Sequence, residues 1–518
     1  MASRSETRTS RRLAGAAAIL MAALIGSRLA GLGRDVAISY QFGTSPELAS
    51  YLAAFRLPDF IFQLVAGAAL ASAFIPTFAR YQAAGEEKEA WLLTSSLLNL
   101  IGIATLFLSV AAVVAAPWFV PLVFSFDPAY QELTVRLTRI MLASPVFFGI
   151  SAILGSALNA RQHFLLPGLA PIVYNLFITA GALFLSPYIG VEGLAWGVTA
   201  GSLAHLLVQL PGLRRQGMDY RLAASLSNPG VREVGRLMGP RVLGLASVQI
   251  NFLVTTALAS KLAYYSIPAL SYAWQVTLLP VGVFGVAISS AVFPTLAEKA
   301  AQATGESMGP TLYTTLRMIL FLTIPSSVGL IVLGQPLIAL LFQRGLFDEQ
   351  SAQATYLAVA FYSTGLFGHT MVEILTRAFY ATHDTRTPVA IGIGSMALSI
   401  ALSLVLMGPL GHGGLALSVA VAAMVEAVVL YRVMRGRLVR QAHQDLGPCL
   451  ARTSLAAAAM GLAVLAMRLL VPSPTTTAGL AAYLAVGVVA GAAIFLGVAY
   501  LLGSQEARLL RRGLALNR

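Results

Sequence analysis

Apolar segments long enough to cross a bilayer recur along the whole chain, and they constrain the fold more than any other feature. A helix needs about 20 apolar residues to span the hydrocarbon core. The chain is 57% hydrophobic and only 11% charged. A lipid-exposed backbone must satisfy its hydrogen bonds internally, and uninterrupted apolar segments of this length are typical of membrane-spanning helices. We therefore predict an all-α integral membrane protein.

The apolar segments predict about fourteen transmembrane helices. They lie near 13–42, 46–83, 90–116, 131–159, 165–186, 191–212, 233–262, 267–303, 309–333, 350–382, 387–407, 413–434, 449–470 and 478–502. Several exceed one membrane thickness and contain Gly or Pro, which is typical of tilted or kinked spans. The arginine-rich start is similar to a signal peptide, but more spans follow without a soluble domain, so we interpret it as an uncleaved first helix.

Basic residues are concentrated in alternate connections between these segments. These connections hold Arg80, Lys88, Arg161, Arg214, Arg215, Arg221, Arg232, Arg236, Lys299, Arg386 and a cluster between 432 and 452. The intervening connections have almost none, apart from Lys261 and Arg344. The positive-inside rule then places both termini in the cytoplasm of a plasma-membrane protein. The same rule, rather than a nucleic-acid partner, explains the formal net charge of +13.

An internal repeat divides the chain. Residues 157–215 align without a gap on 378–436, and ASAFIPTFA (71–79) matches SSAVFPTLA (289–297). With six helices in each half, the halves share one orientation, and such parallel repeats are a transporter architecture. We predict a first lobe at 1–222, a second at 223–440, and two C-terminal helices with a basic tail at 441–518.

Motifs of soluble enzyme chemistry are missing from the chain. There is no G-x-x-x-x-G-K-[ST] phosphate loop and no H-E-x-x-H zinc motif, so ATP hydrolysis and metalloprotease chemistry are not expected. The single cysteine, Cys449, excludes an intramolecular disulfide and a cysteine metal cluster. We expect neither a cofactor nor a metal.

Charged residues lie inside the first two apolar segments. They are Arg28, Arg34, Asp35, Arg56 and Asp59. A lipid-facing Arg or Asp at a helix centre costs about 2.5–3.5 kcal/mol, so these groups predict a protein-lined polar cavity. Two alternatives stay open at this stage. The side chains could snorkel to the interface, or they could neutralise one another in pairs such as Arg34–Asp35.

Several motifs resemble those of the MurJ/MviN family, the lipid II flippases of the MOP exporter superfamily. They are SRLAGLGRD, AFRLP, ASAFIPTFARY, LPVGVFGVAISSAVFPTLA (279–297), LFQRGLFD (341–348) and LTRAFYATHDTRTP (375–388), in the family's order over essentially the whole chain. The resemblance implies two six-helix lobes around a cavity and two C-terminal helices that form a groove for the lipid tail. It also implies outward movement of undecaprenyl-diphosphate-linked disaccharide pentapeptide for cell-wall synthesis.

The family's functional residues carry over only in part. The resemblance places its two first-helix arginines on Arg28 and Arg34, followed by Asp35, and its helix 2 basic residue on Arg56. A third arginine falls on Phe62, and a fourth, in helix 8, falls on Gln275. The acidic residue of helix 2 becomes Ala49. Near the family's sodium site, helix 11 offers Ser395, Ser399 and Ser403 but no carboxylate, and helix 12 contributes Glu426.

The arginines suit a diphosphate headgroup, because a guanidinium presents a planar fork to phosphate oxygens. Our hypothesis is that Arg28 and Arg56 contact the diphosphate while Asp35 orients Arg34; an alternative is that Arg34–Asp35 stabilises or gates the lobe. Arg377 and Glu373 lie at i and i+4, either as a pair within the bundle, which we favour, or as a second polar surface. Arg377 and Arg139 could also replace the lost cations.

The leading interpretation is a lipid II flippase that works by alternating access and uses the membrane potential or an ion gradient, with a coupling cation. One alternative is an exporter of another lipid-linked glycan in the same superfamily. Another is a non-transporting membrane scaffold with a degenerate site, for which Phe62, Trp274 and Gln275 are the evidence.

Overall fold

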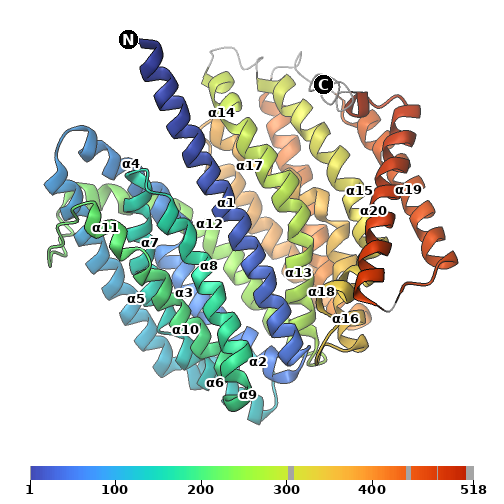
Figure 1. The fold of residues 1–518 in the computed structure, drawn as a ribbon, viewed down its shortest axis with the longest axis horizontal. Coiled ribbons are helices and arrows are strands. Elements are labelled where there is room, and N and C mark those ends of the chain that lie inside the picture. Colours follow the sequence, from blue (N-terminus) through green and yellow to red (C-terminus); the bar gives the residue numbers. More distant parts are fainter. Residues whose placement is uncertain (1, 302–307, 439–444, 475, 509–518) are drawn as a thin grey trace. The chain divides into compact units, whose positions relative to one another are not determined.

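The computed structural model is a bundle of α-helices joined by short connections (Figure 1). It describes residues 2–301, 308–438, 445–474 and 476–508. Within these ranges no residue belongs to a β-strand. The all-α fold expected from the apolar segments is therefore confirmed.

The helices divide into two compact units, residues 1–264 and 265–518. The first unit holds α1 (Ala2–Phe42), α2 (Pro46–Ala54), α3 (Arg56–Ala66), α4 (Ala68–Ala83), α5 (Glu87–Val123), α6 (Pro128–Met141), α7 (Ser144–Ala160), α8 (Leu165–Ala180), η1 (Gly181–Leu185), α9 (Ser186–Ile189), α10 (Glu192–Leu207), α11 (Leu210–Arg215) and α12 (Pro229–Ala259). The second holds α13 (Ser266–Pro280), η2 (Val281–Val286), α14 (Ala287–Ala301), α15 (Met308–Phe342), α16 (Glu349–Thr364), α17 (Leu366–Ala381), α18 (Arg386–Arg437), α19 (Gly447–Leu470) and α20 (Thr477–Leu501).

Helix α12 packs against α3, α4 and α5 of the first unit. In the division into two compact units, α12 follows the predicted boundary at 222/223 but belongs to the same unit as the helices before that boundary. The three domains inferred from the repeat stay a prediction.

Ten helical stretches of the described residues are long and apolar enough to cross a membrane, or eleven if the bent pair Pro229–Gly239 and Gly244–Ala259 is counted as one span. Helix α18 counts once but contains two predicted helices, which Gly411 separates with non-helical backbone angles. Helices α5 and α15 run to Val123 and Phe342, beyond their predicted ends. A multi-pass membrane protein is thus established, and the number fourteen stays a prediction.

The internal repeat has a structural counterpart at its turns. The gapless alignment pairs Gln162 with His383, and these are the two non-glycine residues with positive φ among the described residues, at 61° and 59°. The same register pairs Gly190 with Gly411, whose φ values are 63° and 56°. An L-residue rarely adopts this left-handed conformation, so its recurrence at matched positions supports a true repeat.

Matched contacts close both of these turns. In the first unit Gln216 Nε2 lies 2.5 Å from His163 Nε2. The alignment pairs these residues with Arg437 and Asp384, whose side chains form an ion pair at 2.7 Å. Hydrogen bonds from Thr387 and the Arg437 ion pair hold the pKa of Asp384 well below its ordinary value. The two halves therefore share the position of this contact, but one uses a contact between neutral side chains and the other an ion pair.

A glycine lies at matched positions of two long helical stretches, Pro46–Ala83 in the first unit and Ser266–Ala301 in the second. Regular α-helix is interrupted at both positions. Gly67 separates α3 from α4, and its repeat partner Gly285 lies in the π-helical segment η2. A Cβ on Gly67 would lie 2.7 Å from the carbonyl oxygen of Gln63, and one on Gly285 would lie 2.7 Å from Thr370 Cγ2. Both distances are too short for a side chain, so only glycine fits either break.

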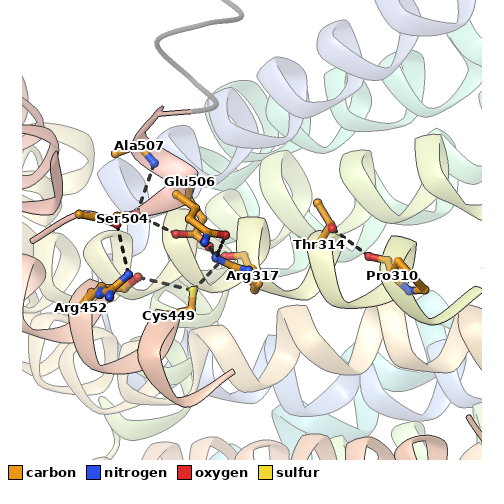
Figure 2. A network of polar contacts seen from close by, with 11 residues as sticks. Pro310, Thr314, Arg317, Cys449, Arg452, Ser504, Glu506 and Ala507 are labelled. Carbon is orange, nitrogen blue, oxygen red and sulfur yellow. Dashed lines mark hydrogen bonds and ion pairs between the residues drawn. The ribbon is translucent and has the colours of Figure 1, made fainter. Parts of the chain in front are cut away.

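A polar cluster fixes the end of α20 to the second unit (Figure 2). Arg317 on α15 donates from Nε to Glu506 Oε1 at 2.6 Å, and Ser504 Oγ donates to Glu506 Oε2 at 2.7 Å. Arg452 on α19 donates to the carbonyl oxygen of Gly503 at 3.2 Å. Glu506 is only 3% exposed. The cluster therefore ties together the ends of three helices that also pack along their lengths.

The charge of Glu506 depends on these contacts. Burial by itself raises the pKa of this carboxyl, but the hydrogen bond from Ser504 and the charge and hydrogen bond of Arg317 outweigh burial, and the net pKa lies below the ordinary 4.5. A depressed folded-state pKa stabilises the fold at pH values above the unfolded pKa. This contribution is lost as the pH falls through the folded value.

We expect Glu506→Gln to lower the free energy of unfolding by about 1–3 kcal/mol, because it leaves Arg317 without its charged partner. Thermal unfolding of the purified protein in detergent measures this. Acidification below the ordinary Glu pKa of 4.5 should destabilise the parent more than the variant. Glu132→Gln, an exposed carboxyl on α6, is the control. Equal unfolding midpoints for parent and E506Q would contradict the assignment.

Candidate functional site

The first-helix charges form an ion pair in the first unit. Arg34 donates from Nε and Nη2 to Asp35 Oδ1 at 3.0 and 2.8 Å. Asp35 is 8% exposed, so its charge is screened little by solvent and depends on its partner. Helix α1 stays helical through Gly31 and Gly33, and a Cβ at either glycine would meet open space. The pair therefore lies on a regular helix that packs against α8.

Tyr174 on α8 links this pair to the second helix. Its phenol interacts electrostatically with Arg34, with Tyr51 of α2 and with Asp59 of α3. Helix α1, the stretch Pro46–Ala83 and α8 thus direct polar groups to one place. Sequence reasoning missed both tyrosines, although each is a polar group in an apolar helix and could have been found on that ground.

Phe62, which the resemblance placed at a family arginine, belongs to an aromatic cluster. Its ring centroid lies 5.3 Å from that of Phe148, which in turn lies 5.0 Å from Tyr174 and 5.2 Å from His205. Such tilted and edge-on pairs add about 0.5–1.5 kcal/mol beyond burial. Phe62 therefore packs with the aromatic side chains that contact Tyr174, and it supplies no positive charge.

His205 carries a polar network next to these rings. Its Nδ1 lies 2.7 Å from Ser151 Oγ, which accepts a hydrogen bond from Gln209 Nε2 at 2.6 Å. Gln209 is 1% exposed. The network joins α7 to α10 and to the residue that precedes α11.

Arg56 begins α3 and contacts α12. Its Nε donates to Thr256 Oγ1 at 2.9 Å, and its guanidinium lies 5.3 Å from the ring centroid of Phe252. Asp59, one turn further along α3, accepts from Gln63 Nε2 at 3.5 Å and interacts electrostatically with Arg56. Asp59 is therefore an acidic neighbour of Arg56 on α3.

Arg28 differs from the other arginines of the site. It is exposed, and in the described part of the chain it forms no hydrogen bond or ion pair. It precedes Arg34 by six residues, which corresponds to about 9 Å along a helix. Its donors are therefore available to a ligand. Arg139, a weaker candidate, donates to the carbonyl oxygen of Val113 at 3.2 Å.

The predicted secondary residues belong to the second unit. Arg377 and Glu373 form the favoured ion pair on α17, with 3.7 Å between Nη2 and Oε2. Arg377 also donates to Ser289, to Ser290 Oγ at 2.8 Å and to the carbonyl oxygen of Val286 at 3.2 Å. This guanidinium thus binds the backbone at the end of η2, where a π-helical segment interrupts regular helix hydrogen bonding.

Gln275 on α13 is exposed. Its neighbour Trp274 packs against Tyr362 and His369, at centroid distances of 5.2 and 5.4 Å. The structure therefore gives Trp274 a packing role. A part for Gln275, Arg377 or Glu373 in substrate binding stays a prediction.

The alignment of the two repeats also places two ionisable side chains at matched positions. It aligns His205 with Glu426 and Tyr174 with Ser395. Ser395 is hydrogen-bonded to Glu426 and also donates to the carbonyl oxygen of Ala422 at 3.2 Å. Matched positions on α10 and α18 thus each hold an ionisable group, a basic one on α10 and an acidic one on α18.

Among the described residues no group of three or more His, Cys, Asp or Glu side chains could hold a metal ion. The candidate site is therefore a set of charged and phenolic groups within the helices of the first unit. Its members are Arg28, Arg34, Asp35, Tyr51, Arg56, Asp59 and Tyr174. Such groups inside a membrane bundle are characteristic of a transport pathway.

Solved structures share this fold. A structure entitled "Lipid II flippase MurJ, inward closed conformation" matches with a TM-score of 0.79 over 93% of this chain and 98% of that chain, at 24% identity. An inward-facing multidrug resistance MATE family transporter of the MOP superfamily matches with a TM-score of 0.68 over 79% and 94%, at 17% identity. The fold is that of MOP-superfamily transporters.

Sequence comparison gives the family. The model for "Lipid II flippase MurJ" matches residues 38–491. The lipid II flippase MurJ of Burkholderia cenocepacia is 31% identical over 80% of this chain and 82% of its own length. The probable lipid II flippase MurJ of Bdellovibrio bacteriovorus is 32% identical over 96% of both chains. This chain belongs to the MurJ family of lipid II flippases, which are transporters.

The Arg34–Asp35 pair gives a test of matched charge. We expect Arg34→Gln and Asp35→Asn each to destabilise the protein strongly, because either leaves one buried charge without a partner. The double variant should be more stable than either single variant. Thermal unfolding of the four proteins in detergent forms a double-mutant cycle. Additive effects of the two substitutions would show that the pair contributes nothing as a pair.

Proposed function

We propose that this chain moves lipid II, the undecaprenyl-diphosphate-linked peptidoglycan precursor, from the inner to the outer leaflet of the plasma membrane by alternating access. The observation that carries the proposal is the family match over residues 38–491, joined to the arginines retained in the first unit. Transport of this lipid supplies cell-wall synthesis. We also propose that both termini lie in the cytoplasm, from the distribution of Lys and Arg.

The first unit divides its cations between two tasks. Arg34 is matched by Asp35, so its net charge is largely compensated. Arg28 is exposed and has no ion-pair partner among the described residues, and Arg56 contacts Thr256 by a hydrogen bond and Asp59 electrostatically. A diphosphate needs charge-assisted donors. We assign Arg28 and Arg56 to the headgroup and Asp35 to the orientation of Arg34.

An exporter of another lipid-linked glycan is the second candidate. Phe62 is held in a ring cluster with Phe148, and Gln275 replaces another family arginine, so two cations are absent. Each charge-assisted bond contributes about 1.5–3 kcal/mol. A headgroup with different contacts would fit this reduced set. A scaffold role is less consistent with the exposed Arg28, because a packing function has no use for it.

The membrane potential can drive outward movement of the headgroup. Two negative charges that cross about 100 mV, inside negative, release roughly 4–5 kcal/mol. We propose that entry of a coupling cation returns the empty carrier.

Arg28→Ala should abolish rescue of cells depleted of their own lipid II flippase, at equal membrane expression. Loss of one charge-assisted contact should slow transport by about 10–100-fold. Lys261→Ala, an exposed basic residue of the same unit, should rescue like the parent. Full rescue by R28A would contradict the headgroup role of Arg28. Failure of the parent itself, with insertion confirmed, would favour another glycan lipid.

Collapse of the membrane potential should slow outward movement of lipid II in proteoliposomes. Potassium gradients with valinomycin set the potential, and enzymatic access to the headgroup reports its side. The rate should rise as the interior becomes more negative, since the transported group is an anion. A rate independent of the imposed potential would contradict an electrogenic outward step.

A further inference from the structure

The connection between α11 and α12 is fixed to the side of α5. Tyr220 donates from its hydroxyl to Asn99 Oδ1 at 2.8 Å, and the Arg221 amide donates to Ser95 Oγ at 3.1 Å. Asn99 Nδ2 in turn donates to the carbonyl oxygens of Arg221 and Ala223, at 3.3 and 2.7 Å. The backbone on both sides of Leu222 is therefore held in place by α5.

Apolar side chains project outward from this fixed connection. Leu222 is 92% exposed and Leu226 is 68% exposed. A leucine on a loose loop could fold back against the protein, but Leu222 is held away from it by the hydrogen bonds of its neighbours. Burial of apolar side chains is favourable, so a surface that presents two exposed leucines favours an apolar environment.

The same connection and the helix ends beside it carry unmatched positive charge. Residues 214–237 contain five arginines and two acidic residues. Asp219 is paired with Arg221, and Glu233 is paired with Arg80. Arg214, Arg215 and Arg236 are exposed and form no ion pair within the described ranges. The surface therefore combines outward leucines with three free guanidinium groups.

The position of this surface relative to the bilayer follows from α5. One face of that helix exposes a continuous series of apolar side chains: Ile103, Leu106, Phe107, Val110, Val114, Trp118 and Leu122. Twenty residues of helix from Ile103 to Leu122 extend about 30 Å, the thickness of the hydrocarbon core. Asn99, which holds Ala223, lies one turn before this face begins. Leu222 is thus fixed at the edge of the lipid-facing band.

We propose that residues 214–237 form an interfacial anchor that docks on anionic phospholipid headgroups of the adjoining leaflet. Leu222 and Leu226 insert at the acyl boundary, and Arg214, Arg215 and Arg236 bind lipid phosphates. Outward apolar groups combined with Lys or Arg are the signature of binding in the membrane interface. A soluble acidic protein is disfavoured as the occupant, because the anchor is fixed at the depth where the lipid-facing band starts.

Nitroxide depth measurement tests this proposal directly. Cys449 is the chain's single cysteine and is buried, so Cys449→Ala gives a background into which Leu222→Cys is introduced and labelled. The full chain is placed in nanodiscs of phosphatidylcholine with or without phosphatidylglycerol. Collision with oxygen reports lipid burial, and collision with a nickel chelate reports water. A label at Glu86→Cys, on an exposed acidic turn, is the control.

With phosphatidylglycerol present, the label at 222 should be protected from the nickel chelate, while the label at 86 stays accessible. The triple change of Arg214, Arg215 and Arg236 to Gln should shift the equilibrium toward water by about a hundredfold, since each cation near an anionic surface contributes about 1 kcal/mol. The matched triple change to Lys keeps the charge and should preserve protection. High salt should weaken insertion, because surface charges are screened.

Three results would overturn the anchor. The label at 222 could be open to the nickel chelate in both lipid mixtures. It could be equally buried with and without anionic lipid, or unaffected by the triple Gln change. It could become protected only when an acidic soluble protein is added. The assay needs no substrate, so its outcome is independent of the proposed transport of lipid II.

Discussion

The hydrocarbon core of a bilayer offers no hydrogen-bond partner, so a charged group placed there needs a partner from the protein or a water-filled cavity. In the first unit this constraint acts on Arg34 and Asp35, which lie side by side on α1 and neutralise one another. Tyr174 and Tyr51 surround the pair from α8 and α2. The charges that could not be tolerated alone thus fix how three helices of this unit face each other.

The other arginines of the two units differ from Arg34 in their contacts. Arg28 is exposed and has no partner within the described residues, while Arg56 reaches across to Thr256 on α12. Arg377 in the second unit is bound instead to the interrupted helix at Val286 and the following serines. The two units therefore use arginine differently: Arg28 of the first is exposed without a partner among the described residues, whereas Arg377 of the second binds backbone at the end of η2.

The internal repeat shows where the two units differ. Their backbone turns match, whereas the side chains at matched positions have different chemistry. Gln162 and His383 adopt the same left-handed conformation, and the clasps beside them join His163 to Gln216 and Asp384 to Arg437. Gly67 and Gly285 lie at matched breaks, where a Cβ would meet the Gln63 carbonyl oxygen in the first unit and Thr370 Cγ2 in the second. Sequence alignment of the halves paired Gln162 with His383 and His163 with Asp384, while the shared left-handed conformation and the contacts beside it came from the structure.

The sequence by itself determined the helical fold, its repeat, the family and the membrane-buried charges, since apolar length, glycine positions and the cost of charge in lipid are all properties of the chain's order. Only the tertiary structure decided which charges are matched. It brought Tyr174 near Arg34, placed Phe62 in a ring cluster and fixed Leu222 beside the exposed apolar face of α5. Those contacts join residues far apart in the chain, and their geometry depends on packing between helices, which local pattern does not encode.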